Sequence, residues 1–116
     1  MKTLLTGMVL LMAVMANGQG FSIGHTSKTF IDATRNNRNV PAEIYYPSNS
    51  DGDNVTVASG TFPVIAFGHG FVMGIDSYEN IWTALVAEGF IVAMVNTETG
   101  FSPSHNNFGK DLAFII

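Results

Sequence analysis

The sequence predicts an α/β fold, and three observations lead to this prediction. Residues 26–33 and 40–46 are rich in β-branched and aromatic side chains, which indicates two strands. Two continuous apolar runs, at 63–67 and 90–95, indicate strands that are covered on both faces. A helical pattern lies between these runs, and a strand-helix-strand order of this length favours parallel strands. The predicted fold therefore has antiparallel leading strands followed by a parallel β-α-β core.

The composition limits the classes of protein to which the chain can belong. The 116 residues are 47% apolar and 12% charged, with no cysteine and a formal net charge of −4, which fits one small domain. Residues 20–116 carry a net charge of −5, so they lack the basic surface that nucleic acids or anionic membranes attract. No run of about 18 apolar residues follows residue 20, and we expect no membrane span there.

Residues 1–19 have the pattern of a secretory signal peptide. Lys2 gives a positive start, residues 4–15 form an apolar core, and small or polar residues follow at 16–19. A membrane anchor or a buried helix is the alternative, but the apolar stretch is short for a bilayer span. We therefore expect a secreted or periplasmic protein with no stable membrane insertion after the signal is cleaved.

The two leading strands are expected to pair antiparallel, because only a short asparagine-rich turn at 35–39 separates them. Pro47 is expected to end the second strand. Pro41, within that strand, predicts an edge position or a strand start, because proline has no N–H to donate to a ladder. The polar residues 48–60 predict a surface loop.

A helix is predicted between the two apolar runs. Asp76 or Ser77 can cap its start, and Gly89 follows its end at Ala87 as a stop. Its apolar face consists of Ile81, Trp82, Leu85 and Val86.

A loop at 96–103 and a last helix follow the second apolar run. Ser104 or His105 is expected to open that helix, and its apolar face consists of Phe108, Leu112 and Ile115.

We expect the loop Gly68–Gly74 to carry function, because ligands of open α/β sheets bind at the carboxyl ends of parallel strands. In one interpretation the loop is an oxyanion hole. Gly70 then permits an unusual backbone conformation that leaves the next N–H free. A fixed donor of this kind stabilises the negative oxygen of a tetrahedral acyl-transfer intermediate.

Three alternatives stay open at this point. Gly68, Gly70 and Gly74 also fit the phosphate loop of a dinucleotide-binding oxidoreductase, in which Glu98 would bind a ribose hydroxyl. The bulky residues 71–72 count against the close approach of a diphosphate. The loop can also be a glycine-rich turn without chemistry, and the chain can be a secreted binding module whose early strands belong to a β-sandwich.

Several segments resemble the α/β-hydrolase superfamily. The predicted strand and loop at 62–71 have the sequence FPVIAFGHGF, and the helix start at 78–82 has the sequence YENIW. The predicted strand at 88–93 has the sequence EGFIVA, and the early strand at 38–47 has the sequence RNVPAEIYYP. The closest branch is that of the chlorophyllase-like, dienelactone-hydrolase-like and polyester-hydrolase (cutinase)-like esterases. The resemblance covers about residues 26–116.

The resemblance implies roles for a few residues. His69 and Gly70 match the family's His-Gly pair, and Phe71 matches the position whose N–H enters the oxyanion hole and whose ring lines the acyl-binding cleft. Met73 is interpreted as cleft wall or packing, and Trp82 as helix core. Glu98 and Thr99 follow the next strand and are interpreted as solvated loop.

The family's catalytic triad is not found in this chain. No serine has glycines two residues before and after it, so the G-x-S-x-G elbow is absent, and the histidines precede the place where that elbow would lie. Ser104 and His105 are neighbours that do not face each other, so no dyad is expected there. We therefore interpret residues 20–116 as the N-terminal portion of an α/β-hydrolase domain, with an incomplete sheet, truncated before the nucleophile.

The expected full-length protein is a serine hydrolase that acts on small-molecule or polymeric carboxylic esters, without a cofactor or metal. The chain as printed is expected to be inactive.

Overall fold

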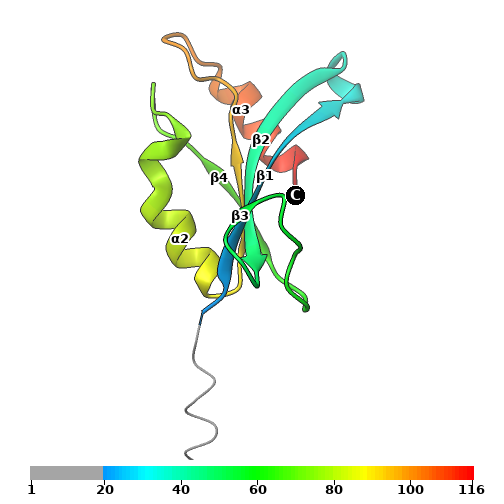
Figure 1. Cartoon of the computed structure of the whole chain (residues 1–116). Coiled ribbons are helices and arrows are strands. Elements are labelled where there is room, and N and C mark those ends of the chain that lie inside the picture. The colour runs from blue at the N-terminus through cyan, green and yellow to red at the C-terminus, as the bar shows by residue number, and fades with distance from the viewer. Residues whose placement is uncertain (1–19) are drawn as a thin grey trace, which may run out of the picture.

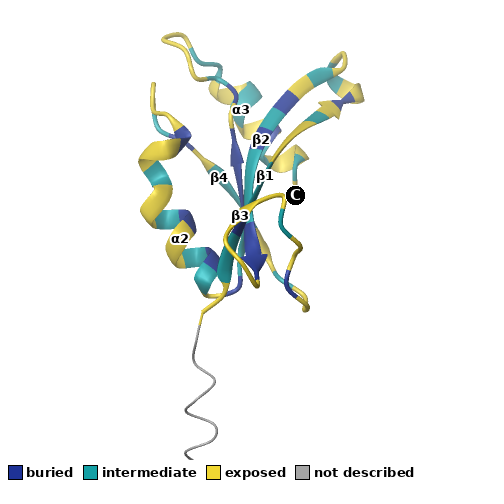
Figure 2. Cartoon of the chain, in the orientation of Figure 1, coloured by how far each residue is buried: buried dark blue, intermediate teal, exposed yellow. Residues whose placement is uncertain are grey.

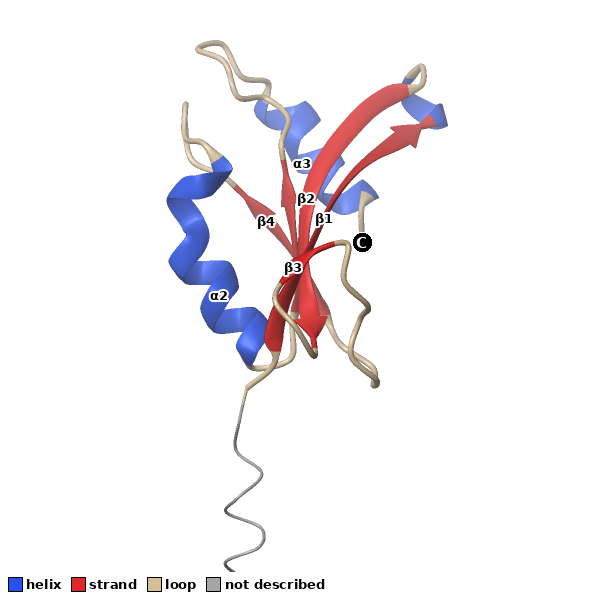
Figure 3. Cartoon of the chain, viewed as in Figure 1, coloured by secondary structure: helices blue, strands red, loops and turns tan. Residues whose placement is uncertain are grey.

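The computed structural model describes residues 20–116, so the predicted signal peptide at 1–19 lies outside the described residues. They form one mixed sheet of five strands with two α-helices (Figures 1 and 3). This α/β arrangement agrees with the predicted fold class. In chain order the elements are β1 (Ser22–Asp32), the 3-10 turn η1 (Ala33–Arg35), β2 (Arg38–Ser48), β3 (Gly52–Asp53), β4 (Val64–Gly68), the 3-10 turn η2 (Ile75–Tyr78), α2 (Glu79–Ala87), β5 (Ile91–Val95) and α3 (His105–Phe114).

The strand order of the sheet is β3-β1-β2-β5-β4. β1 and β2 are antiparallel, in a register that pairs Ser22 with Ser48. β4 and β5 are parallel, with Val64 opposite Ile91, and α2 connects them. β2 joins the two halves because it also pairs antiparallel with β5. The antiparallel leading pair and the parallel β-α-β unit are therefore both confirmed.

Pro41 does not mark an edge or a strand start, because it lies inside β2, between β1 and β5. The ladder between β2 and β5 begins at the next residue, Ala42. Pro41 contributes its carbonyl oxygen, which accepts a hydrogen bond from the Asn96 N–H at 2.8 Å. The missing donor therefore falls at the end of one ladder, where a proline interrupts little. β2 also continues through Pro47 instead of ending there.

Both edges of the sheet differ from the predictions. β4 is less buried than predicted: Val64 is 45% exposed, and Figure 2 shows β4 less buried than β5. Within residues 20–116 no strand lies on its outer side. At the other edge, residues 52–53 of the predicted loop form β3, which pairs parallel with β1.

α2 covers one face of the sheet with the apolar side chains that the sequence predicts. Trp82 and Val86 are buried. The Trp82 ring stacks on Tyr45 of β2, with ring centroids 4.0 Å apart and planes 6° apart. Trp82 and Tyr45 belong to one hydrophobic cluster, which also contains two buried side chains of β5, those of Val92 and Met94. The interpretation of Trp82 as core is therefore confirmed.

The start of α2 differs from the prediction, and its end agrees with it. Asp76 and Ser77 lie in η2, and α2 begins after Tyr78 without a side-chain capping bond. The Ser77 N–H instead donates to the Gly74 carbonyl at 3.2 Å, so a tighter backbone turn replaces the cap. Gly89 ends the helix with a φ of +97°, a conformation that glycine adopts without strain.

α3 covers the opposite face of the sheet (Figure 1). Ser104 caps it, because its Oγ accepts a hydrogen bond from the Asn107 N–H at 3.2 Å. Leu112 of α3 lies over Gly68, whereas the preceding residue, Phe67, packs against the α2 cluster. Consecutive strand residues point to opposite faces, which is how one strand serves both helices. In the described part of the chain, neither helix is long and apolar enough to cross a membrane.

Candidate functional site

The loop Gly68–Gly74 follows the carboxyl end of β4 and is anchored by His69. This side chain is only 9% exposed. Its Nε2 lies 2.6 Å from the carbonyl oxygen of Thr97, which follows β5, and its Nδ1 lies 2.8 Å from the carbonyl oxygen of Gly70. The ring also packs on Phe108 of α3, with centroids 4.6 Å apart. His69 therefore joins the ends of both parallel strands to α3.

Gly70 is needed for space rather than for backbone freedom. The sequence predicts an unusual backbone conformation at Gly70, but Gly70 does not have a positive φ. A Cβ at Gly70 would lie 2.9 Å from Met73 Sδ and 3.1 Å from Tyr78 Oη. The Gly70 N–H donates to Tyr78 Oη at 2.6 Å, and a side chain would crowd this bond. The reason for glycine is therefore the close approach of Tyr78.

The unusual backbone conformation lies two residues later, at Val72, which has a φ of +53°. The Met73 N–H donates to the Gly70 carbonyl at 3.2 Å, which closes a four-residue turn with Val72 in its third position. A β-branched residue pays about 1–3 kcal/mol for a positive φ. Such strain is typical of functional loops. It is not predictable from the sequence, because valine rarely adopts a positive φ.

Phe71 occupies the second position of this turn, with its ring 64% exposed. Its N–H donates no hydrogen bond to any group within residues 20–116. The neighbouring N–H groups of Gly70 and Met73 are both engaged, as described above. Within residues 20–116 the turn therefore presents two backbone donors without a partner, the N–H groups of Phe71 and Val72, and the first of them lies at the position that the resemblance predicts.

A small cavity of about 60 Å³ is lined in part by Phe71. Phe71, one of the residues that line it, is exposed and has an exposed aromatic neighbour. Phe101, 83% exposed, meets Phe71 edge to face with ring centroids 6.5 Å apart. The residues that line the cavity are His69, Gly70, Phe71, Glu98, Pro103, His105 and Phe108.

Glu98 belongs to this cavity, so its interpretation as solvated loop is wrong. Its side chain is 15% exposed and forms an ion pair with Arg38 Nη2 at 3.0 Å. Its other oxygen accepts a hydrogen bond from the Ser104 N–H at 2.7 Å. Since both carboxylate oxygens are engaged, Glu98 is poorly placed to bind a ribose. Thr99, the next residue, is exposed as predicted.

The other predicted site residues lie outside the cavity or serve the fold. Met73, 41% exposed, packs against the far side of Gly70, where its Sδ accepts a hydrogen bond from the Tyr78 hydroxyl at 3.2 Å. Its role in substrate binding stays a prediction. The Ser104 hydroxyl is occupied as the cap of α3, so it forms no dyad with His105.

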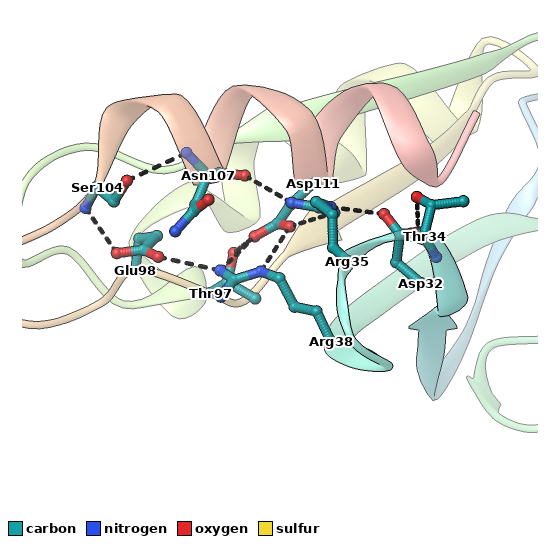
Figure 4. Close-up of polar contacts among 9 residues, drawn as sticks. All are labelled: Asp32, Thr34, Arg35, Arg38, Thr97, Glu98, Ser104, Asn107 and Asp111. Carbon is teal, nitrogen blue, oxygen red and sulfur yellow. Dashed lines mark hydrogen bonds and ion pairs between the residues drawn. The ribbon is translucent and has the colours of Figure 1, made fainter.

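A network of buried charges supports the loops around the cavity, and Figure 4 shows its members. Asp111 of α3 is fully buried and accepts two hydrogen bonds from Arg38, at 2.9 and 2.8 Å, and one from the Thr97 hydroxyl at 2.7 Å. Arg35 Nη2 lies 2.7 Å from the same carboxylate. Burial alone would raise the pKa of Asp111, but these donors outweigh it and lower the pKa to about 2. No sequence pattern predicts this network, because residues as distant as Arg38 and Asp111, which lie 73 positions apart, belong to it.

A second polar cluster lines a larger hollow of about 440 Å³ on the α2 face. His25 of β1 contacts Glu43 through Nε2 at 2.6 Å and Asp53 through Nδ1 at 2.7 Å. The Ser27 hydroxyl also donates to Glu43, at 2.6 Å. Burial lowers the pKa of His25, but the two carboxylates outweigh burial and the pKa is raised. This cluster was not predicted either, because no spacing in the sequence brings its residues together.

Within residues 20–116, no group of histidine, aspartate or glutamate side chains has an arrangement that would hold a metal ion. Neither a protein-family model, a curated protein nor a solved structure matches this chain.

Proposed function

We propose that the chain provides the oxyanion-binding part of a serine hydrolase that acts on carboxylic esters. The observation that carries this proposal is the Phe71 N–H, which has no acceptor within residues 20–116 and belongs to a residue that lines a small cavity at the end of a parallel strand. An oxyanion hole requires a donor of this kind, fixed before the substrate arrives. The α/β sheet, with antiparallel strands before a parallel core, is consistent with the resemblance to α/β-hydrolases.

The rigidity of the turn supports the proposal. The buried His69 ring contacts the carbonyl groups of Gly70, in the turn, and of Thr97, after β5. Tyr78 holds the Gly70 N–H, and the strained φ of Val72 persists only when its surroundings enforce it. A donor held in this way needs little reorganisation when negative charge develops on a carbonyl oxygen.

The surroundings of the cavity favour an apolar acyl or alkyl group in the substrate. Four large apolar side chains in two loops are 41–83% exposed: Phe71, Val72, Met73 and Phe101. Contiguous exposed apolar groups beside a polar pocket are typical of binding sites. We therefore propose that hydrophobic esters, small or polymeric, bind across Phe71 and Phe101.

The nucleophile of the proposed reaction is a serine that lies outside the printed sequence. A histidine would take its proton as the serine attacks the ester carbonyl, and a carboxylate would orient that histidine. In this scheme the Phe71 N–H and the N–H that follows the serine stabilise the oxyanion. The printed chain alone is predicted to have no esterase activity.

Two substitutions at residue 71 of the complete protein test the proposal. Phe71→Pro removes the N–H, and proline is compatible with the second position of such a turn. Phe71→Ala keeps the N–H and removes the ring, so it is the matched control. With p-nitrophenyl esters of short and long acyl chains, we expect Phe71→Pro to lower kcat about 10²- to 10³-fold. Phe71→Ala is expected to act mainly on KM, and more for long acyl chains.

The proposal fails if Phe71→Pro and Phe71→Ala have the same kcat, or if the complete protein hydrolyses no ester. Saturable binding of NAD(P) by the complete protein would favour the dinucleotide alternative instead.

A further inference from the structure

We infer that Thr97 and Asp111 are positioning residues for the candidate oxyanion pocket, which they hold through His69. This inference rests on the proposed function for its effect on catalysis, but the contacts that carry it are independent of the reaction. They form one continuous path from α3 to the turn that contains Phe71.

The path begins at His69. A neutral imidazole has one N–H, so it donates fully to one carbonyl oxygen at a time. The contact of Nε2 with the Thr97 carbonyl, at 2.6 Å, is shorter than that of Nδ1 with the Gly70 carbonyl, at 2.8 Å. We therefore place the N–H on Nε2, so that the Thr97 carbonyl orients the ring. The ring then donates nothing to the Gly70 carbonyl, and it acts on the Gly70 peptide because His69 directly precedes Gly70 in the chain.

Thr97 is itself held from the opposite side. Its hydroxyl donates to Asp111 Oδ2 at 2.7 Å, and the residue is only 9% exposed. Asp111 has no exposed surface and cannot shift easily, because Arg38 holds both of its oxygens. A bidentate arginine-carboxylate pair fixes direction as well as distance. Thr97 thus connects Asp111 to His69: its hydroxyl bonds to Asp111, and its carbonyl oxygen contacts His69.

The same arginine also controls a charge beside the cavity. Glu98 lines the cavity, and a free carboxylate there would oppose the negative charge of an oxyanion. Arg38 Nη2 pairs with Glu98 at 3.0 Å while it also holds Asp111. The network in Figure 4 therefore does two things for the pocket: it fixes the turn, and it compensates the nearest carboxylate.

The test uses three substitutions that change little volume. Thr97→Val removes the hydroxyl that Asp111 holds, and Thr97→Ser keeps it. Thr34→Val is the matched control: the Thr34 hydroxyl also donates to a carboxylate of the same network, that of Asp32 at 2.6 Å, but it has no contact with His69. The first measurement is the NMR spectrum of the printed chain, with the imidazole ¹⁵N signals of His69 and the amide signals of Gly70 and Phe71.

We expect Thr97→Val to shift these signals and to lose the fixed tautomer of His69. Thr97→Ser and Thr34→Val should leave them at their wild-type positions. If Thr97→Val leaves the His69 ring and the Gly70 and Phe71 amides unchanged, or if Thr34→Val shifts them equally, the inference is overturned.

The second measurement is ester hydrolysis by the complete protein. A turn that is held loosely binds the transition state less well, so we expect Thr97→Val to lower kcat roughly ten- to a hundredfold with little change in KM, and Thr97→Ser to restore it. A shift in the NMR signals together with an absence of any esterase activity would retain the positioning of His69 and reject the proposed function. A shift with unchanged kcat in an active esterase would overturn the catalytic part of the inference.

Discussion

Two charged clusters fasten the β1–β2 pair to the rest of the molecule, and they differ in burial and in chemistry. The Asp111 cluster, which consists of Arg35, Arg38, Glu98 and Asp111, connects the hairpin tip to α3 and the loop after β5. The His25 cluster, which consists of His25, Ser27, Glu43 and Asp53, connects β1 and β2 to β3. The carboxylate at the centre of the first cluster is fully buried, whereas the Asp53 side chain in the second is 77% exposed.

The comparison shows how the choice of cation sets the pH range in which a cluster holds. Arginine keeps its charge at any pH at which the protein is folded. Histidine titrates in the moderate range, and the raised pKa of His25 moves that titration upward. The Asp111 cluster is therefore permanent above strongly acidic pH, and it lies beside the candidate site. The His25 cluster is strongest while His25 is protonated, because only the imidazolium donates to both carboxylates.

The largest effect is expected for Asp111→Asn. The neutral amide cannot compensate the charge of Arg38, and the partly buried guanidinium is left without its main partner. Breaking a buried pair in this way costs about 3–5 kcal/mol of the free energy of unfolding. Urea denaturation followed by circular dichroism measures this change.

Asp32→Asn is the matched control for that measurement. Asp32 is also buried, at 5% exposed, and it binds Arg35 at 2.6 Å, but Arg35 keeps its contact with Asp111 in this variant. We expect a clearly smaller loss than for Asp111→Asn. Equal losses from the two variants would contradict the central place given to Asp111.

The sequence was sufficient to predict those elements whose causes are local. Gly89 and Ser104 end and begin helices at the predicted places, because a helix stop and a cap depend on neighbouring residues alone. The two apolar runs form parallel strands because their order with α2 favours that arrangement. The exposure of Val64 in β4 was not predictable from the same pattern, because an apolar run does not reveal what covers it.

The residues of the candidate site also fall into two groups, those that a local motif predicts and those that only the fold brings together. The His-Gly pair and Phe71 lie in one short segment, so a motif was enough to find them. Arg38 and Asp111 meet only because the fold brings the first residue of β2 to α3, 73 residues later in the sequence. The strain at Val72 was hidden for another reason: the conformation is imposed by the turn and opposes the preference of the residue.

An acid titration separates the two clusters. The pKa of Asp111 in the folded chain, about 2, is below its ordinary value of 3.8. Its contribution is therefore complete above about pH 4 and is lost as the pH falls through about 2; it amounts to about 2 kcal/mol. We expect the free energy of unfolding of the wild type to fall over this range. In a Thr97→Val variant, which lacks one of the donors to Asp111, the fall should be smaller and should begin at a higher pH.

The His25 cluster should respond at the other end of the pH scale. Because the pKa of His25 is raised above 6.5 in the folded chain, its contribution is complete below 6.5 and is lost as the pH rises through the raised value. The charged groups that face His25 are Glu43, Asp53 and, across the hollow, Asp76; Tyr45, which stacks on it, stays neutral because its pKa is raised to about 12.

His25→Gln tests this dependence. We expect the wild type to lose about 0.5–1 kcal/mol in free energy of unfolding between about pH 6 and about pH 9, and the variant to show no such loss. Urea denaturation at the two pH values measures it. Parallel losses in both proteins would mean that another group is responsible.

The smallest effect on the free energy of unfolding is expected for Asp53→Asn, because Asp53 is exposed whereas the central carboxylate of the other cluster, Asp111, is buried. The substitution removes a single exposed carboxylate from His25, and Glu43 keeps its contact with the other ring nitrogen. Three further bonds still hold the β3 segment: the Ile23 N–H to Asp51, the Thr26 hydroxyl to Asn54, and the Asn54 N–H to the His25 carbonyl. The free energy of unfolding should therefore change by less than about 0.5 kcal/mol.

The pKa of His25, measured by NMR titration in the Asp53→Asn variant, should nevertheless fall, because one of the two carboxylates that raise it is gone. An unchanged pKa of His25 would show that solvent already screens the charge of Asp53. Glu43 alone would then set the pH at which His25 loses its proton and its ion pair.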